Sequence, residues 1–91
     1  PEVKDAYVFM RDPMKGDCED FVITFIELNI RSGYIKQNEA RWISGKLNGK
    51  NHAWAIIKNR YLFDSYYPEG ELLEVAYREQ SYESRFTIYS Y

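Results

Sequence analysis

Three residues of this sequence could together perform nucleophilic chemistry on an acyl group. Cys18 is the only cysteine and lies in the segment 16–20 (GDCED), where a turn gives way to an apolar run typical of a helix. A helix N-terminus favours the thiolate, which is the reactive form of the thiol. His52 is the only histidine, and Asp64 ends the segment 61–64 (YLFD). A nucleophile, a base and a carboxylate that could orient the base are therefore all present.

Acyl transfer by a thiol needs a deprotonated sulfur, a base that later protonates the leaving group, a group that holds this base in the right tautomer, and donors for the oxyanion. Cys18, His52 and Asp64 can fill the first three roles. For the fourth we expect the backbone N–H of Cys18, because the first N–H groups of a helix have no partner within it. The sequence points to no side chain that would complete this oxyanion site.

Each of these residues also has an ordinary structural interpretation. A lone buried cysteine such as Cys18 commonly behaves as a small hydrophobic residue, and a lone histidine on a strand is often structural. A cysteine at a helix start, followed by a histidine and an aspartate on adjacent strands, nevertheless favours a thiol triad. No metal is expected, because one cysteine and one histidine would leave the other zinc ligands to carboxylates.

Three aromatic residues near the histidine and the aspartate are candidates for substrate binding. Trp54 could shield the imidazole and the carboxylate from water, or it could be an ordinary core residue. Tyr66 and Tyr67 could form the rim of a substrate groove, or they could be surface aromatics beside a proline turn. The sequence leaves both alternatives open.

The elements that must position these residues fit one small domain spanning 1–91, with one helix packed on one sheet. Apolar residues spaced by three and four predict a helix from residue 19 to about residue 31. Asp17 is its expected N-cap after a turn at 13–16, and Gly33 its expected stop. Because the segment is apolar on nearly all sides, we expect the helix to be buried.

Strands are expected in the second half of the chain. The segment 40–47 predicts a strand that ends at Asn48-Gly49, a strong hairpin signal because both positions of a type I′ turn need positive φ. A returning strand over 51–58 and a third over 61–64 complete an antiparallel meander. The segment 71–80 fits a helix or a strand equally well, and 84–91 is typical of a terminal strand.

The turn between the second and third strands decides whether the proposed triad can form. A two-residue loop at 59–60 would place Asp64 on the sheet face opposite His52, because side chains alternate along a strand. A three-residue loop at 58–60, with Asn59 or Arg60 in the left-handed region, would pair residue 57 with residue 61. Asp64 would then lie diagonal to His52 on the same face. We predict the three-residue loop or an equivalent bulge.

Composition excludes several classes of function. The net charge is −2 with acids and bases interspersed, and no basic block is present that would follow a phosphate backbone, so nucleic acid is not an expected partner. The longest apolar stretch, 21–26, is far shorter than the roughly 20 residues of a membrane span, so no membrane partner is expected either. A lone cysteine cannot form an intramolecular disulfide, which favours a reducing compartment such as the cytoplasm.

The segment 16–21 (GDCEDF) resembles the nucleophile motif of the transglutaminase-like superfamily, within the papain-like cysteine peptidases. The segments 52–54 (HAW) and 63–66 (FDSY) are similar to that family's histidine and aspartate motifs. The resemblance implies an α+β fold in which a central helix carries the cysteine at its start and packs on an antiparallel sheet. It also implies Cys18, His52 and Asp64 as a catalytic triad that acts on amide bonds of a peptide or protein without a cofactor.

The chain departs from the family in having only a short region before Cys18. The upstream helical region of the family, which often supplies an oxyanion donor and part of the groove, is expected to be missing or reduced. The chain is then a minimal core, a fragment, or a subunit whose groove a partner completes, and its oligomeric state stays open. The expected function is a cysteine peptidase or amidase, or a transglutaminase. The alternative is a catalytically inactive module that binds peptides or proteins.

Overall fold

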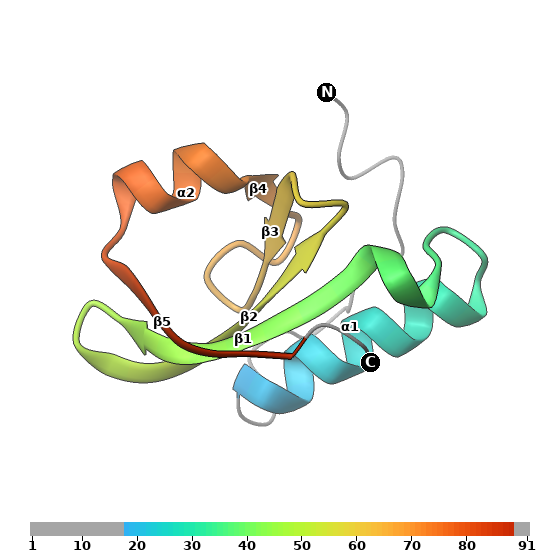
Figure 1. Cartoon of the computed structure of the whole chain (residues 1–91), viewed down its shortest axis with the longest axis horizontal. Helices are drawn as coiled ribbons and strands as arrows, with labels where there is room; N and C mark the ends of the chain where they lie inside the picture. Colours follow the sequence, from blue (N-terminus) through green and yellow to red (C-terminus); the bar gives the residue numbers. More distant parts are fainter. Residues whose placement is uncertain (1–17, 89–91) are drawn as a thin grey trace.

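The computed structural model describes residues 18–88, with side chains from 20 to 85, and has an α+β fold (Figure 1). Its five strands form one antiparallel sheet in the order β4-β3-β2-β1-β5. The elements in chain order are α1 (Cys18–Arg31), the 3-10 turn η2 (Gln37–Glu39), β1 (Ala40–Leu47), β2 (Lys50–Ile57), β3 (Tyr61–Phe63), β4 (Glu71–Leu72), α2 (Leu73–Glu79) and β5 (Tyr82–Ile88). The turn expected at 13–16 and the cap expected at Asp17 lie outside the described residues.

Helix α1 is buried on one side only, so the expectation of a helix buried all round was wrong. Its apolar side chains pack into the molecule, whereas a polar stripe at spacings of three and four faces solvent. The exposed residues are Asp20, Thr24, Glu27 and Arg31. The helix ends as expected near Gly33, whose φ of 81° is the left-handed conformation that suits glycine at a helix end. The N–H of Gly33 donates to the carbonyl of Ile30 at 3.0 Å.

The hairpin between β1 and β2 confirms the prediction from Asn48-Gly49. The φ angles are 52° at Asn48 and 85° at Gly49, and Leu47 pairs with Lys50 across the turn. Both turn residues therefore adopt the positive φ that a type I′ turn requires. The predicted strand over 40–47 matches β1, and the returning strand begins one residue earlier than expected.

The three-residue loop at 58–60 is also confirmed. Ile57 pairs with Tyr61 and Ala55 with Phe63, as this loop requires. Asn59 is left-handed with φ 55°, as predicted, and Lys58 adopts the same conformation with φ 56°. This register places even-numbered residues of β2 and β3 on one face of the sheet, and odd-numbered residues on the other.

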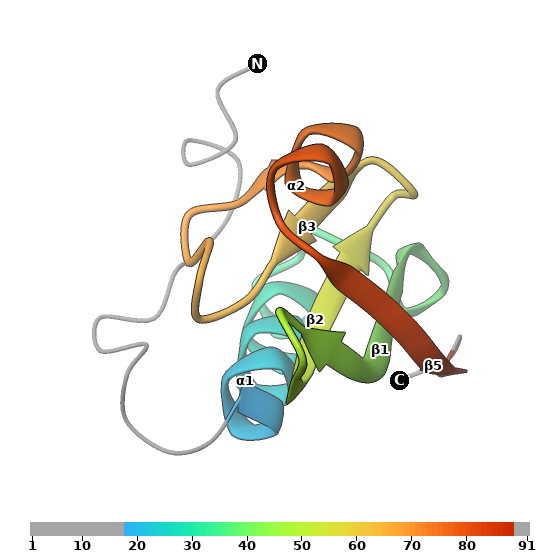
Figure 2. The same ribbon diagram turned by 90° about the vertical axis from the view of Figure 1, so that its left-hand side faces the viewer.

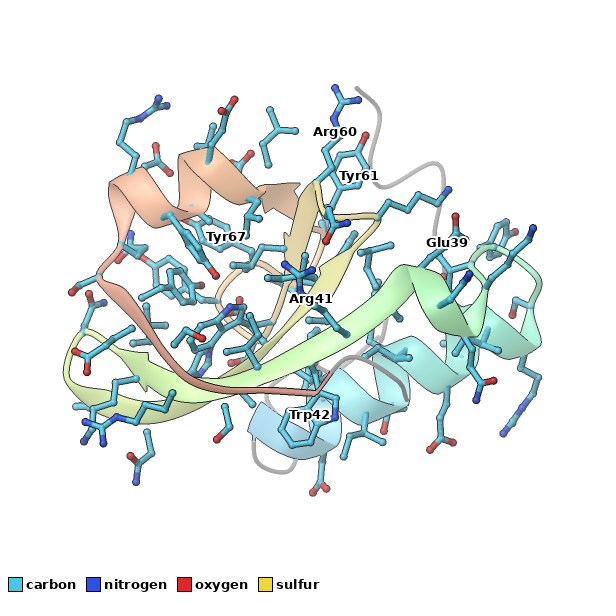
Figure 3. The ribbon with its side chains drawn as sticks, viewed as in Figure 1. Glu39, Arg41, Trp42, Arg60, Tyr61 and Tyr67 are labelled. Atoms are coloured by element: carbon cyan, nitrogen blue, oxygen red, sulfur yellow. The ribbon has the colours of Figure 1, made fainter. Side chains whose placement is uncertain are left out.

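The two faces of the sheet carry separate apolar clusters. Helix α1 covers one face and α2 the other (Figures 1 and 2). The buried residues of the α1 cluster are Phe21, Val22, Phe25, Ile26, Ile35, Ala40, Ala53, Ala55, Ile57 and Phe63. Those of the α2 cluster are Ile43, Trp54, Ile56, Leu62 and Ala76. The alternation is visible on β1, where Arg41 and Trp42 lie on opposite sides of the strand (Figure 3).

The C-terminal segments combine the two alternatives expected for 71–80. Residues 71–72 form β4 beside β3, and the chain then turns into α2. Strand β5 begins at Tyr82, earlier than the predicted 84, and pairs with β1, so it returns to the opposite edge of the sheet. A register shift between Ser44 and Gly45 interrupts the β1–β5 pairing. Neither of the two α-helices in the described part of the chain has the length and apolarity needed to cross a membrane.

Candidate active site

His52 and Asp64 form a close pair on the α2 face of the sheet. Nε2 of His52 lies 2.7 Å from Oδ2 of Asp64. The histidine side chain is 11% exposed and the aspartate side chain 0%. His52 lies on β2, and Asp64 directly follows β3. The three-residue loop therefore brings the two residues to the same face, as the sequence predicted.

The Asp64 carboxylate accepts hydrogen bonds from four groups. Oδ1 accepts from the backbone N–H of Tyr66 at 3.0 Å and from that of Tyr67 at 2.7 Å. Oδ2 accepts from the hydroxyl of Tyr82 at 2.7 Å, in addition to its contact with His52. A buried carboxylate needs such partners, because an unsatisfied charge in the interior is very costly.

These contacts decide which nitrogen of His52 is available for chemistry. All four neighbours of Asp64 can donate, so the pair is best satisfied when Nε2 of His52 carries a proton and donates to Oδ2. Nδ1 is then the nitrogen that can accept or release a proton. This is the arrangement in which a carboxylate orients a histidine base.

An aromatic cluster encloses the pair. Trp54 is fully buried, and its ring centre lies 6.1 Å from that of His52 with the planes 23° apart. Tyr82 meets Trp54 edge-on at 4.8 Å, and Nε1 of Trp54 donates to the hydroxyl of Tyr77 at 3.2 Å. Trp54 thus flanks the pair from the interior, where it keeps water away.

Tyr66 and Tyr67 connect Asp64 to the end of α2. Tyr66 is 52% exposed, and its hydroxyl accepts from the Gln80 side chain at 3.1 Å. The half-buried Tyr67 lies on the α2 side of the sheet, and its hydroxyl donates to Glu79 at 3.2 Å (Figure 3). Burial, together with the Glu79 carboxylate, raises the pKa of Tyr67. Both tyrosines therefore shape the site through their backbone N–H groups as well as their rings.

Tyr82 is the site residue that the sequence did not indicate. It lies on β5, which pairs with β1 rather than with the strands that carry His52 and Asp64. No local pattern marks such a contact, because it depends on how the chain returns after α2. Burial raises the pKa of the Tyr82 hydroxyl well above its usual value, and the charge of Asp64 raises it further. The hydroxyl is therefore a permanent donor at neutral pH.

Because Gly45 has no side chain, it leaves room for the aromatic cluster around His52 and Asp64 to pack against β1. It is the cross-strand partner of His52 on β1. A Cβ atom at this position would lie 2.1 Å from the carbonyl oxygen of Glu83 and 3.0 Å from Cη2 of Trp54. The absence of a side chain thus allows β5 and the tryptophan ring to approach β1 closely.

Cys18 is the first residue of α1, and its side chain lies outside the described side chains. Figures 1 and 2 show the first turn of α1 toward the β1–β2 hairpin, and Figure 1 shows its last turn toward η2. His52 lies near the start of β2, and so toward the same end of the sheet. Helix α1 packs on the sheet face opposite the one that carries His52.

An open hollow of about 340 Å³ adjoins His52 at the hairpin. Its lining residues are Leu47, Asn48, Lys50, Asn51 and His52. A larger hollow of about 740 Å³ lies between η2 and the loop at 58–60, toward the other end of β2, and contains neither member of the pair. Among side chains 20–85, no three histidine, cysteine or acidic groups gather as they would around a metal ion.

The sequence matches no protein-family model, no curated protein and no solved structure in comparisons with each.

Proposed function

We propose that this chain catalyses thiol-dependent acyl transfer on amide bonds, with Cys18 as nucleophile, His52 as acid and base, and Asp64 as the group that orients His52. The observation that carries the proposal is the 2.7 Å contact between Nε2 of His52 and the buried carboxylate of Asp64. In this proposal, Nδ1 of His52 is the nitrogen that exchanges a proton with the thiol. The proposal includes a papain-like core in which α1 presents the cysteine at its N-terminus.

The reaction begins when His52 takes the proton of Cys18 at Nδ1. The sulfur attacks the carbonyl carbon of the amide, and the backbone N–H of Cys18 donates to the oxyanion that forms. The C–N bond then breaks as the leaving nitrogen takes the proton from His52, and a thioester remains on Cys18. Water attacks this thioester after giving a proton to His52, and the C–S bond breaks to release a carboxylic acid and the protonated thiol.

Hydrolysis is favoured over transfer to an amine. The imidazole of His52 retains 11% exposure, and the hollow beside it is open, so water reaches the acyl group readily. The chain is then a cysteine peptidase or amidase that acts on a peptide or protein. A transglutaminase reaction would follow the same steps, with an amine in place of water.

The second candidate is a catalytically inactive module that binds peptides or proteins. The exposed rings of Tyr66 and Tyr77 favour it, at 52% and 42% exposure, because both lie beside the His52–Asp64 site and could contact a peptide. In this case Trp54, Tyr66 and Tyr67 would be binding or packing residues only.

The single cysteine allows a direct test by alkylation with iodoacetamide, followed by intact mass. An unperturbed thiol is a few per cent thiolate at pH 7, so a thiolate paired with His52 should react roughly tenfold faster at that pH. Its rate should also change little between pH 6 and pH 9, whereas that of a free cysteine peptide rises steeply. His52→Ala should return the rate and its pH profile to those of the free thiol.

Tyr34→Phe is a suitable control, because Tyr34 is 49% exposed and lies in the loop after α1. It should alkylate at the wild-type rate. If the wild-type chain reacts no faster than a free thiol and His52→Ala changes nothing, the enzyme proposal is wrong. A slow thiol in a chain that still binds peptides would identify the binding module.

A further inference from the structure

We infer that Tyr82 is a positioning residue that shares the charge of Asp64 with His52 and so limits the basicity of the imidazole. This inference rests on the proposed function for its role in catalysis. The contact itself is independent of that function. The Tyr82 hydroxyl donates to Oδ2 of Asp64 at 2.7 Å, and the same oxygen lies 2.7 Å from Nε2 of His52.

The two oxygens of Asp64 are held in different ways. Oδ1 is fixed by two backbone N–H groups, which no side-chain substitution removes. Oδ2 faces only two side-chain donors among the described residues, His52 and Tyr82. Without the Tyr82 hydroxyl, His52 would be the only side chain left to balance the charge on Oδ2. A carboxylate that accepts one hydrogen bond fewer carries more uncompensated charge. It therefore stabilises the imidazolium more strongly, because hydrogen bonds to a buried charge are strong.

The aromatic neighbours hold the Tyr82 ring in place. Its centre lies 4.8 Å from that of Trp54, 5.6 Å from that of Tyr77 and 6.3 Å from that of His52. These three ring contacts restrict the orientation of the Tyr82 ring, and so the direction in which its hydroxyl points. The raised pKa of Tyr82 keeps this hydroxyl protonated at neutral pH.

Among side chains 20–85, few other titratable groups face the pair. Tyr67 and Tyr77 approach from the α2 side, and Lys50 lies in the hollow next to His52. Glu79 faces the hydroxyl of Tyr67. At neutral pH the tyrosine hydroxyls are uncharged, so Asp64 is the charged group in direct contact with His52, and the Tyr82 bond to the same oxygen can moderate that contact.

The test is an NMR titration of the single imidazole, which needs no assignment because the chain has one histidine. Tyr82→Phe keeps the ring and removes only the hydroxyl. We expect it to raise the pKa of His52 by about 0.5 to 1 pH unit. Tyr77→Phe, which removes a hydroxyl from the same cluster without touching Asp64, should leave the His52 pKa unchanged.

The direction in which the His52 pKa shifts in Tyr82→Phe shows whether Tyr82 shares the charge of Asp64 or only packs in the fold. If Tyr82 only supported the fold, its loss would loosen Asp64, and the pKa of His52 would stay the same or fall. Either result would overturn the inference. Tyr82→Phe keeps the ring contacts with Trp54 and Tyr77, so a failure of this variant to fold would show that the hydroxyl mainly supports the fold and would also overturn the inference.

The alkylation rate of Cys18 distinguishes a failure of this inference from a failure of the proposed function. A more stable imidazolium favours the thiolate, so Tyr82→Phe should react faster than the wild-type chain with iodoacetamide at pH 5. If Cys18 behaves as a free thiol in both proteins while the NMR shift appears, the proposed function fails and the Tyr82 contact stands. If Cys18 is activated by His52 but neither the shift nor the faster reaction appears, the Tyr82 inference alone fails.

Discussion

Asp64 has no exposure to solvent, and an isolated carboxylate in that position would destabilise the fold by several kcal/mol. Four donors surround it, two from its own loop and two from side chains of β2 and β5. The loop donors would suffice for an ordinary turn. The additional approach of a histidine and a tyrosine to one oxygen concentrates polar groups in the interior, and the proposed catalytic role rests on this arrangement.

Asp64→Asn tests this carboxylate without changing its shape. The amide oxygen can still accept from the N–H groups of Tyr66 and Tyr67, but the amide NH2 then faces two donors, His52 and Tyr82. We expect the unfolding free energy to fall by about 1–3 kcal/mol, because polar groups become mismatched in the interior. His52 should also change tautomer, and alkylation of Cys18 should slow to the rate of a free thiol.

The measurements are urea unfolding and the iodoacetamide rate at pH 7. Glu83→Gln makes the same chemical change at a side chain that is 68% exposed, so it should affect neither. If Cys18 in Asp64→Asn reacts with iodoacetamide at the wild-type rate, the carboxylate does not orient the base.

At the scale of elements, the parts of the fold that the sequence could predict were those with local causes. Asn48 and Gly49 tolerate positive φ, so the β1–β2 hairpin could be placed. The loop at 58–60 could be chosen from two alternatives because only one of them brings Asp64 to the face of His52. That choice used the expected chemistry as a constraint on register, and the strand pairing bears it out.

Features that depend on distant contacts could not be predicted in the same way. The apolar run of α1 contains a polar stripe, and only packing on the sheet shows which side is exposed. The segment 71–80 divides into β4 and α2 because Leu72 can pair with Tyr61 before the chain leaves the sheet. Tyr82 reaches Asp64 only because β5 pairs with β1, a partner that no local pattern specifies.

Gly45→Ala tests how closely β5 must approach β1. The new Cβ would lie 2.1 Å from a backbone oxygen of β5, which no side-chain movement can relieve. We expect a loss of about 1–3 kcal/mol in unfolding free energy, because the β1–β5 pairing must shift. The shift should also withdraw Tyr82 from Asp64 and move the His52 resonance in NMR spectra.

Gly33→Ala is the matched control for the new side chain. Its Cβ would meet nothing within 4 Å, although its φ of 81° carries its own strain. Gly33→Ala should therefore lower stability without moving the His52 resonance. If the His52 resonance is unchanged in Gly45→Ala, the geometry of the site does not depend on how closely β5 approaches β1.

At the scale of the whole molecule, the sheet separates two layers with different roles. The α1 layer is almost entirely apolar, and it supplies much of the burial that holds the fold together. The α2 layer contains His52, Asp64 and the tyrosines around them, so its packing includes hydroxyls and a carboxylate. The stability of this second layer should therefore depend on pH in a way that the first does not.

The unfolding free energy is expected to depend most clearly on pH under alkaline conditions. In the unfolded chain Tyr82 titrates near its ordinary pKa of 10.0, whereas burial and Asp64 raise the pKa of the folded form. Above pH 10 the unfolded chain has therefore lost a proton that the folded protein retains. Because stability falls with pH wherever the unfolded state binds fewer protons, the contribution of Tyr82 is complete below about pH 10 and decreases as the pH rises.

Urea unfolding between pH 8 and pH 10.5 measures this loss. Tyr82→Phe should show a smaller decrease in unfolding free energy over that range, although some decrease should remain because the pKa of Tyr67 is also raised. Tyr34→Phe should behave as the wild-type chain, because its side chain is exposed and outside the site. Identical slopes for Tyr82→Phe and the wild-type chain would mean that the hydroxyl ionises freely in the folded protein, and that it does not act as a fixed donor to Asp64.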